Sequence, residues 1–118
     1  MTLDEFFAGR DESRRIFAVL HSAAEDLGSV ALRVTTSQVA FRRRIGFAWV
    51  WIPEMYLTGA VAPLVLSVSL RRRDGSPRWR EVVEPYPGRF MHHLELRDPG
   101  EIDAEVRGWL AEAWESAG

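Results

Sequence analysis

This chain of 118 residues contains neither cysteine nor lysine. Without cysteine there is no disulfide, no thiol nucleophile and no thiolate ligand for a metal. Without lysine there is no Schiff-base or lysine general-base chemistry. All 15 basic residues are therefore arginine. Because Ala, Gly and Val are also abundant, this bias fits a GC-rich genome and does not by itself indicate phosphate binding.

Long apolar runs are missing as well. The longest, Ala60 to Leu66, is interrupted by Pro63 and is far too short to cross a bilayer. The first residues include Asp4 and Glu5, where a signal peptide would carry basic residues. With 47% apolar and 27% charged residues, the composition is that of a globular protein. We expect a cytoplasmic protein without membrane contact, folded as a single domain over 1–118.

Helical periodicity occurs at both ends of the chain. A short helix is expected over 3–8, with Thr2 and Glu5 forming a capping box. A longer helix is expected over 11–27 and a third over 99–115, the latter with Asp98 as its N-cap. The apolar stripe of this last helix consists of Ile102, Val106, Trp109, Leu110 and Ala113.

The central part of the chain alternates with the period of β-strands. Strands are expected over 29–34, 38–43, 47–52, 64–71 and 90–96, and the segment 78–88, with its prolines, is expected to be a loop. The predicted fold class is α+β: an antiparallel sheet of about four strands, with the N- and C-terminal helices packed on one face.

The two faces of this sheet differ in their side chains. Burying a large apolar side chain stabilises the fold by roughly 1.5–3 kcal/mol, so we expect Phe47, Trp49 and Trp51 beneath the helices. The opposite, open face would then have an apolar centre within a polar surround. The expected members of this open face include Arg42, Ala48, Val50, Ile52, Val65, Ser67, Ser69, Met91, His93 and Glu95.

Several segments together resemble a bacterial family of small domains of unknown function, numbered 5655. These segments are EFFAGR, VAFRRRIGFAWVWIP, SPRW and RFMHHLELRDPGEIDAEVRGWLAEAW. The resemblance extends from about Phe6 to Trp114, and a more distant likeness links the chain to small proteins of the YdhG type. This resemblance supports the α+β fold and implies no catalytic residue.

The tandem histidines are the most conspicuous candidate site. Adjacent residues of a strand point to opposite faces, so His92 and His93 do not converge on one metal ion, and no metal or cofactor is expected. We expect His92 at the edge of the core, bonded to the backbone or to an acid such as Asp103. His93 is expected on the open face, where a ligand or partner could contact it.

The arginines cluster in the middle of the chain, where Ser29 to Arg97 contains eleven arginines and five acidic residues. In an antiparallel sheet the segments 42–44 and 71–73 end at the same edge, so they should converge into an arginine rim. Arg42, Arg44, Arg71 and Arg73 are its candidate anion-binding residues.

These observations leave several functions open. The favoured prediction is a non-enzymatic binding domain that forms a homodimer, or docks an unknown protein partner, through the open face. The alternatives are nucleic-acid or other polyanion binding at the arginine rim, and small-molecule binding under the 78–88 loop with Trp79 and Tyr86 as a lid. An enzyme that uses His93 with Ser67 or Ser69 is a further hypothesis, without a recognisable catalytic motif.

Overall fold

A computed structural model describes all 118 residues and contains one antiparallel sheet of six strands. The strands are β1 (Ala31–Val34), β2 (Val39–Arg42), β3 (Gly46–Trp51), β4 (Leu64–Leu70), β5 (Glu81–Tyr86) and β6 (Arg89–Leu96), in the spatial order β1-β2-β3-β4-β6-β5. The helices are α1 (Leu3–Phe6), α2 (Asp11–Glu25) and α3 (Ala104–Ser116), with 3-10 turns η1 (Pro53–Met55) and η2 (Pro99–Glu101). The α+β class is confirmed, whereas the expected number of about four strands is too low.

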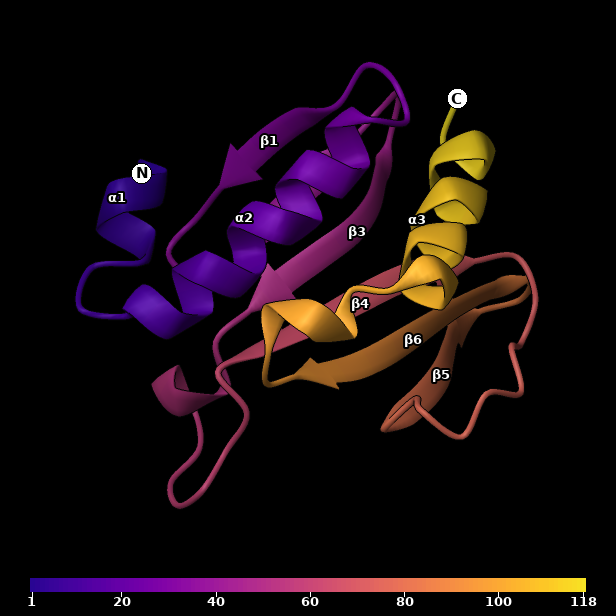
Figure 1. Cartoon of the computed structure of the whole chain (residues 1–118). Coiled ribbons are helices and arrows are strands. Elements are labelled where there is room, and N and C mark those ends of the chain that lie inside the picture. Colours follow the sequence, from indigo (N-terminus) through magenta and orange to yellow (C-terminus); the bar gives the residue numbers. More distant parts are fainter.

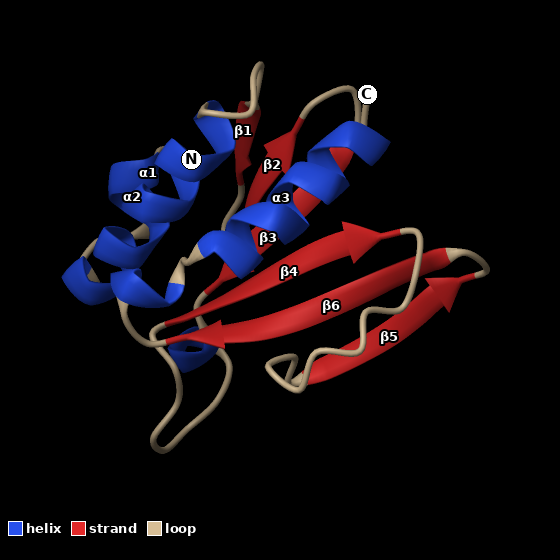
Figure 2. Cartoon of the chain, turned by 45° about the vertical axis from the view of Figure 1, so that its right-hand side comes forward, coloured by secondary structure: helices blue, strands red, loops and turns tan.

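The helices α2 and α3 lie on the same face of the sheet (Figures 1 and 2). Between them and the sheet lies a core of 26 buried residues, to which the sheet contributes alternate positions of its central strands. The expected apolar stripe is buried throughout, from Ile102, which directly follows η2, to Ala113 of α3. The aromatic rings of Phe17 on α2 and Phe41 on β2 lie 5.7 Å apart, which shows how closely α2 packs on the sheet. None of the helices has the length and apolar composition that a bilayer span requires.

The helix starts follow local capping chemistry. Thr2 and Glu5 form the expected capping box at α1. Asp98 also caps a helical turn, but that turn is η2 and ends at Glu101. The α-helix begins later, at Ala104, where Asp103 accepts a hydrogen bond from the backbone N–H of Val106 at 3.1 Å. Two consecutive caps therefore divide the helix that was expected over 99–115.

The segment that we expected to be a loop over 78–88 contains the edge strand β5 instead. Pro85 misled this prediction, because proline cannot donate to a strand ladder. On β5 only one side of the backbone is paired, with β6, and the register shifts between Val83 and Tyr86, which makes room for the proline. Edge strands tolerate proline for this reason, and the charged residues and proline of β5 also discourage pairing with another chain.

A β-bulge decides which residues of β3 face the helices. Phe41 pairs with Ala48 and Arg42 with Gly46, so Phe47 is the extra residue on β3. Phe47 is buried in the core as expected, but the alternation after it is reversed. The face assignment of the residues that follow was therefore wrong: Ala48, Val50 and Ile52 lie in the core, and Trp49 and Trp51 lie half-buried on the open face.

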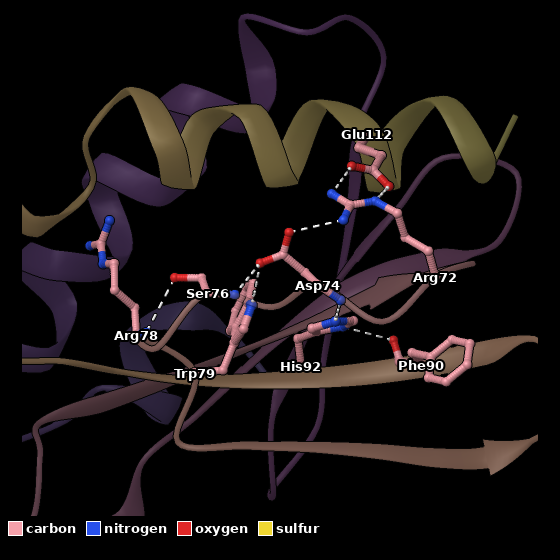
Figure 3. A network of polar contacts seen from close by, with 8 residues as sticks. All are labelled: Arg72, Asp74, Ser76, Arg78, Trp79, Phe90, His92 and Glu112. Atoms are coloured by element: carbon pink, nitrogen blue, oxygen red, sulfur yellow. Dashed lines mark hydrogen bonds and ion pairs between the residues drawn. The ribbon is translucent and has the colours of Figure 1, made fainter.

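The β4–β5 connection is held against α3 by a polar network around Asp74 (Figure 3). Its carboxylate accepts hydrogen bonds from Arg72, from the backbone of Ser76 and from the indole of Trp79 at 2.8–3.0 Å. Arg72 also binds Glu112 of α3 through two hydrogen bonds of 2.8 and 2.9 Å. Burial acts to raise the pKa of Asp74, but these hydrogen bonds outweigh it and hold the pKa below its ordinary value.

His92 belongs to the same network and is completely buried. Its Nε2 accepts a hydrogen bond of 2.9 Å from the backbone N–H of Asp74, and its Nδ1 lies 3.1 Å from the carbonyl oxygen of Phe90. Because Nε2 accepts, Nδ1 carries the proton and donates it to that carbonyl. His92 therefore bonds to the backbone, one of the two expected partners, while Asp103 pairs with Arg78 at 3.0 Å.

Candidate ligand-binding face

One row of paired residues crosses the open face, which is the side of the sheet opposite α2 and α3. In this row Ala40 of β2 is paired with Trp49, Trp49 with Ser67, and Ser67 with His93. Arg33 on β1 and Glu81 on β5 complete the row at its two ends. Because directly paired residues of antiparallel strands point to the same side, all six side chains belong to the open face.

On the open face, the side chains of β4 are shorter than those of its neighbours β3 and β6. On β4 the outward residues are Val65, Ser67 and Ser69, which are only 3–5% exposed because larger side chains rise on both sides. Trp49 and Trp51 form one wall from β3, and Met91 and His93 form the other from β6. The backbones of β3 and β6 are separated by two strand spacings, about 10 Å. We call this depression, with Val65, Ser67 and Ser69 as its floor, the trough.

Two adjacent pockets of about 300 Å³ each occupy the trough, one around Ser67 and the other at the Val65 end. They share Trp51 and His93. The first is lined by Gln38, Trp49, Trp51, Ser67, Met91 and His93. The second extends toward the β3–β4 connection, and its lining includes Pro53, Leu57, Val61, Val65, Arg80, Glu81, Glu95 and Arg97.

His93 stands between the two pockets with one nitrogen fixed and the other available. Its Nδ1 lies 2.7 Å from the hydroxyl of Ser67, while its Nε2 makes no hydrogen bond within the chain. Burial lowers the pKa of His93, and the nearby carboxylate of Glu81 opposes this shift without cancelling it. The imidazole is therefore neutral at pH 7 and offers Nε2 to a bound molecule.

Arginines lie at both ends of the trough. At the Ser69 end, Arg89 donates a hydrogen bond of 2.7 Å to the hydroxyl of Ser69. At the Val65 end, Arg80 and Arg97 lie 3.1 and 3.8 Å from the carboxylate of Glu95. These last two side chains are 64% and 57% exposed, so each can turn toward a ligand at low cost.

The two arginine triplets do converge, but on the C-terminal end of α3. Arg43 donates to the carbonyl oxygen of Trp114 at 3.1 Å and lies over the indole ring, and Arg71 reaches the carbonyl of Ser116 at 3.4 Å. The backbone N–H of Arg44 donates to Ala117. These cations satisfy carbonyl groups at a helix end that carries partial negative charge. The side chains of Arg43 and Arg71 are thus occupied in capping α3, whereas Arg44 contributes only its backbone N–H.

The remaining candidate residues are distributed over the molecule. Arg42 lies on the open face beside the bulge, and Arg73 donates to the carbonyl of Val82 at 3.5 Å. Trp79 cannot be a lid, because it is buried between His92 and Trp109 on the helix side, with its ring 4.0 Å from that of Trp109. Tyr86 is exposed, next to the guanidinium of Arg89.

Val50 and Ile52, which we expected to contact a partner, lie in the core instead. The sequence analysis missed Trp49 and Trp51 as site residues for the same reason, because the bulge was not recognised. One clue was present in the sequence: Gly46 precedes the aromatic residues, and a side chain at this position would lie 2.8 Å from the ring of Trp49. A glycine within an aromatic strand often marks a bulge or a close approach.

Comparison with known families matches residues 3–117 to the family described as Domain of unknown function (DUF5655). The chain belongs to this family. The match confirms the resemblance found in the sequence. It covers the three α-helices and all six strands of the sheet. Neither the curated proteins nor the solved structures contain a significant match.

Proposed function

We propose that this domain is a non-enzymatic binding module, and that the trough on its open face holds the planar, unsaturated part of a ligand. The observation that supports this proposal is the position of Trp49 and Trp51. Both indoles are half-buried on the face that no helix covers, and both line pockets. Indole rings outside the core offer a flat apolar surface that binds other planar groups by stacking.

The opposite wall complements these indoles. Met91 is flexible, and its thioether makes favourable contacts with aromatic rings. His93 adds one polar group, Nε2, that has no partner within the chain. Tyr56, whose ring lies 6.3 Å from that of Trp51, continues the aromatic surface toward the β3–β4 connection. A planar ligand with one hydrogen-bonding edge satisfies all of these groups together.

The surroundings of Ser67 favour binding over catalysis. Its hydroxyl is within reach of His93, as an enzyme would require, but the residue is only 5% exposed on a central strand. β4 is paired on both sides, with β3 and β6, so backbone N–H groups beside Ser67 are engaged in the ladders. An oxyanion needs free donors of this kind, and the sheet provides none here.

The prediction of a homodimer, or of docking to a protein partner, depended on an apolar centre formed by Ala48, Val50, Ile52, Val65 and Met91. The first three lie under the helices, so only Val65 and Met91 of this centre remain on the open face, as parts of the trough. A concave surface with aromatic walls suits an inserted group better than a second flat sheet. We retain the expected cytoplasmic location as part of this proposal.

The indole N–H resonances provide a direct test, because the five tryptophans include built-in controls. Uncharged two-ring aromatic fragments should shift the signals of Trp49 and Trp51, identified by their loss in Trp49→Phe and Trp51→Phe variants. The signals of Trp79 and Trp114 should not move, because their N–H groups bond to Asp74 and to the carbonyl of Ser29.

The Trp51→Ala variant should bind these fragments at least about fivefold more weakly, since one stacking partner is worth about 1–3 kcal/mol. The proposal fails if no planar fragment perturbs Trp49 or Trp51 up to millimolar concentration.

A further inference from the structure

We propose that the ligand of the trough is single-stranded nucleic acid, with bases stacked on the indoles of Trp49 and Trp51 and phosphates bound by arginines at the two ends of the trough. This inference rests on the proposed function and specifies its ligand. It depends on how charge is distributed between the two sides of the sheet, and on the position of the unpaired arginines relative to the aromatic wall.

Charge is segregated between the helices and the sheet. The acidic residues concentrate in the segments that form α1, α2 and α3, and the arginines concentrate in the strands and their connections. The arginines that face α3 are neutralised there: Arg72 pairs with Glu112 at 2.8 Å, and Arg78 lies 2.9–3.0 Å from Asp103 and Glu105. The helix side therefore has little attraction for a polyanion, despite its arginines.

The open face retains free cations. Arg33, Arg42 and Arg89 all belong to this face, and no carboxylate lies within salt-bridge distance of any of them. Arg80 and Arg97 share the single carboxylate of Glu95. Counting Glu81 as well, the face carries more positive than negative charge, although the whole chain has a formal net charge of −2. A local positive surface of this kind attracts phosphates even on an acidic protein.

The cations lie on both ends of the aromatic trough rather than around one point. Arg42 is paired with Gly46 at the beginning of β3, where β4 ends, and Arg89 binds Ser69 at the same end. Arg80 and Arg97 lie at the opposite end, near Val65. A mononucleotide presents its phosphate at one position and would need converging donors there. Cations at both ends suit a backbone that enters and leaves the trough.

The stacking surface selects single strands over duplexes. Trp49 and Trp51 are two positions apart on one strand, with only Val50 between them, so they offer successive platforms along the trough. Bases can reach these indoles only when they are unpaired and turned away from their neighbours. The trough offers few polar groups for reading base edges, with Gln38, Ser67 and His93 as the nearest, so binding should be weakly dependent on sequence.

Fluorescence anisotropy with a labelled oligothymidylate of about ten nucleotides tests this inference on the full chain. We expect binding that weakens steeply as salt rises, because phosphate contacts release counterions. Trp51→Ala should weaken binding at least fivefold while Trp51→Phe retains most of it. Arg89→Ser should weaken binding and reduce its salt dependence. The matched control is Arg107→Ser, which removes an exposed arginine of α3 outside the open face and should leave the affinity unchanged.

Three results would overturn the inference. In the first, thymidine monophosphate binds as tightly as the oligonucleotide, which would assign the trough to a free nucleotide. In the second, Arg107→Ser and Arg89→Ser weaken binding equally, which would indicate attraction to charge without a site. In the third, no nucleic acid binds while uncharged fragments still shift the indole signals of Trp49 and Trp51. That last result would reject nucleic acid and leave the proposed binding function intact, whereas the absence of any fragment binding would reject both.

Discussion

His93 and Ser67 are joined across β6 and β4 by a side-chain hydrogen bond of 2.7 Å, and neither side chain has another hydrogen-bond partner within the chain. The two residues are directly paired in the ladder, so the bond runs perpendicular to the strands, from the floor of the trough on β4 to its wall on β6. It fixes the orientation of the imidazole and directs the bonding capacity of Nε2 toward a ligand. The trough is therefore preorganised at His93.

Replacing Ser67 by Ala should test this arrangement. The hydroxyl supplies one partly buried hydrogen bond, so the free energy of unfolding should fall by about 1 kcal/mol. Aromatic fragments should also bind more weakly, because the imidazole is no longer held in place. Urea denaturation and the indole resonances measure the two effects. Ser22→Ala, at an exposed position of α2, is the control and should change neither. Unchanged stability and binding in Ser67→Ala would contradict a role for this bond.

The stability of the protein should fall between about pH 7.5 and pH 5.5. Burial lowers the pKa of both His92 and His93 below the ordinary value of 6.5. The unfolded chain therefore binds protons that the folded chain does not, and stability is lost as the pH falls through 6.5 toward the folded values. The loss per histidine is at most about 1.4 kcal/mol per pH unit.

A glutamine at position 92 separates the two histidines in this experiment. Gln keeps a hydrogen-bond acceptor for the backbone N–H of Asp74 but does not titrate. His92→Gln should therefore be less stable at pH 7.5, yet its stability should depend less on pH than that of the wild type. Urea denaturation at several pH values measures the slope, and an unchanged slope would show that His92 does not titrate as the structure implies.

The face assignment of β3 can be tested with one charged substitution on each side. Val50 is completely buried under the helices, so Val50→Asp should destabilise the fold by about 3–5 kcal/mol and yield little folded protein. Trp51→Asp places the same charge on the open face and should leave a folded chain that no longer binds planar fragments. Circular dichroism and thermal unfolding distinguish the two. If Val50→Asp left the protein folded and Trp51→Asp unfolded it, Trp51 would face the helices, as simple alternation predicts.

The network in Figure 3 makes a separate prediction about Trp79. Trp79→Phe removes the indole donor that bonds to Asp74 at 2.8 Å, so the pKa of Asp74 should rise and stability should fall by about 1–3 kcal/mol. Trp109→Phe alters the stacked ring without touching Asp74 and should leave that pKa unchanged. Carboxyl NMR titration reports the pKa directly. Equal titration of Asp74 in both variants would show that the indole bond is unimportant.

The helices could be predicted from the sequence because their determinants are local. Thr2 and Glu5 lie three residues apart and close a capping box without help from the rest of the chain. The stripe from Ile102 to Ala113 has the period of an α-helix, and all its members are buried as expected. Where the prediction failed, at residues 99–103, two caps competed, and the packing of Ile102 into the core accompanies the later start of α3.

The strands were recognised less completely, because a strand depends on its neighbours. The edge strand β5 carries a proline that a central strand would exclude, and only its position at the edge explains why it is tolerated. The bulge at Phe47 is likewise a property of the β2–β3 pair and not of β3 alone. Period-2 alternation gives the two sides of a strand, but one extra residue exchanges them.

By itself, the sequence determined the α+β class, the helix caps, the core stripe of α3 and the opposite orientation of His92 and His93, since each follows from spacing along the chain. Only the tertiary structure decided which side chains share the open face. The bulge turned Trp49 and Trp51 outward, the pairing of β4 with β6 joined Ser67 to His93, and the end of α3 engaged Arg43 and Arg71. Each of these contacts joins residues distant in the sequence, and pairing register, not local periodicity, brings them together.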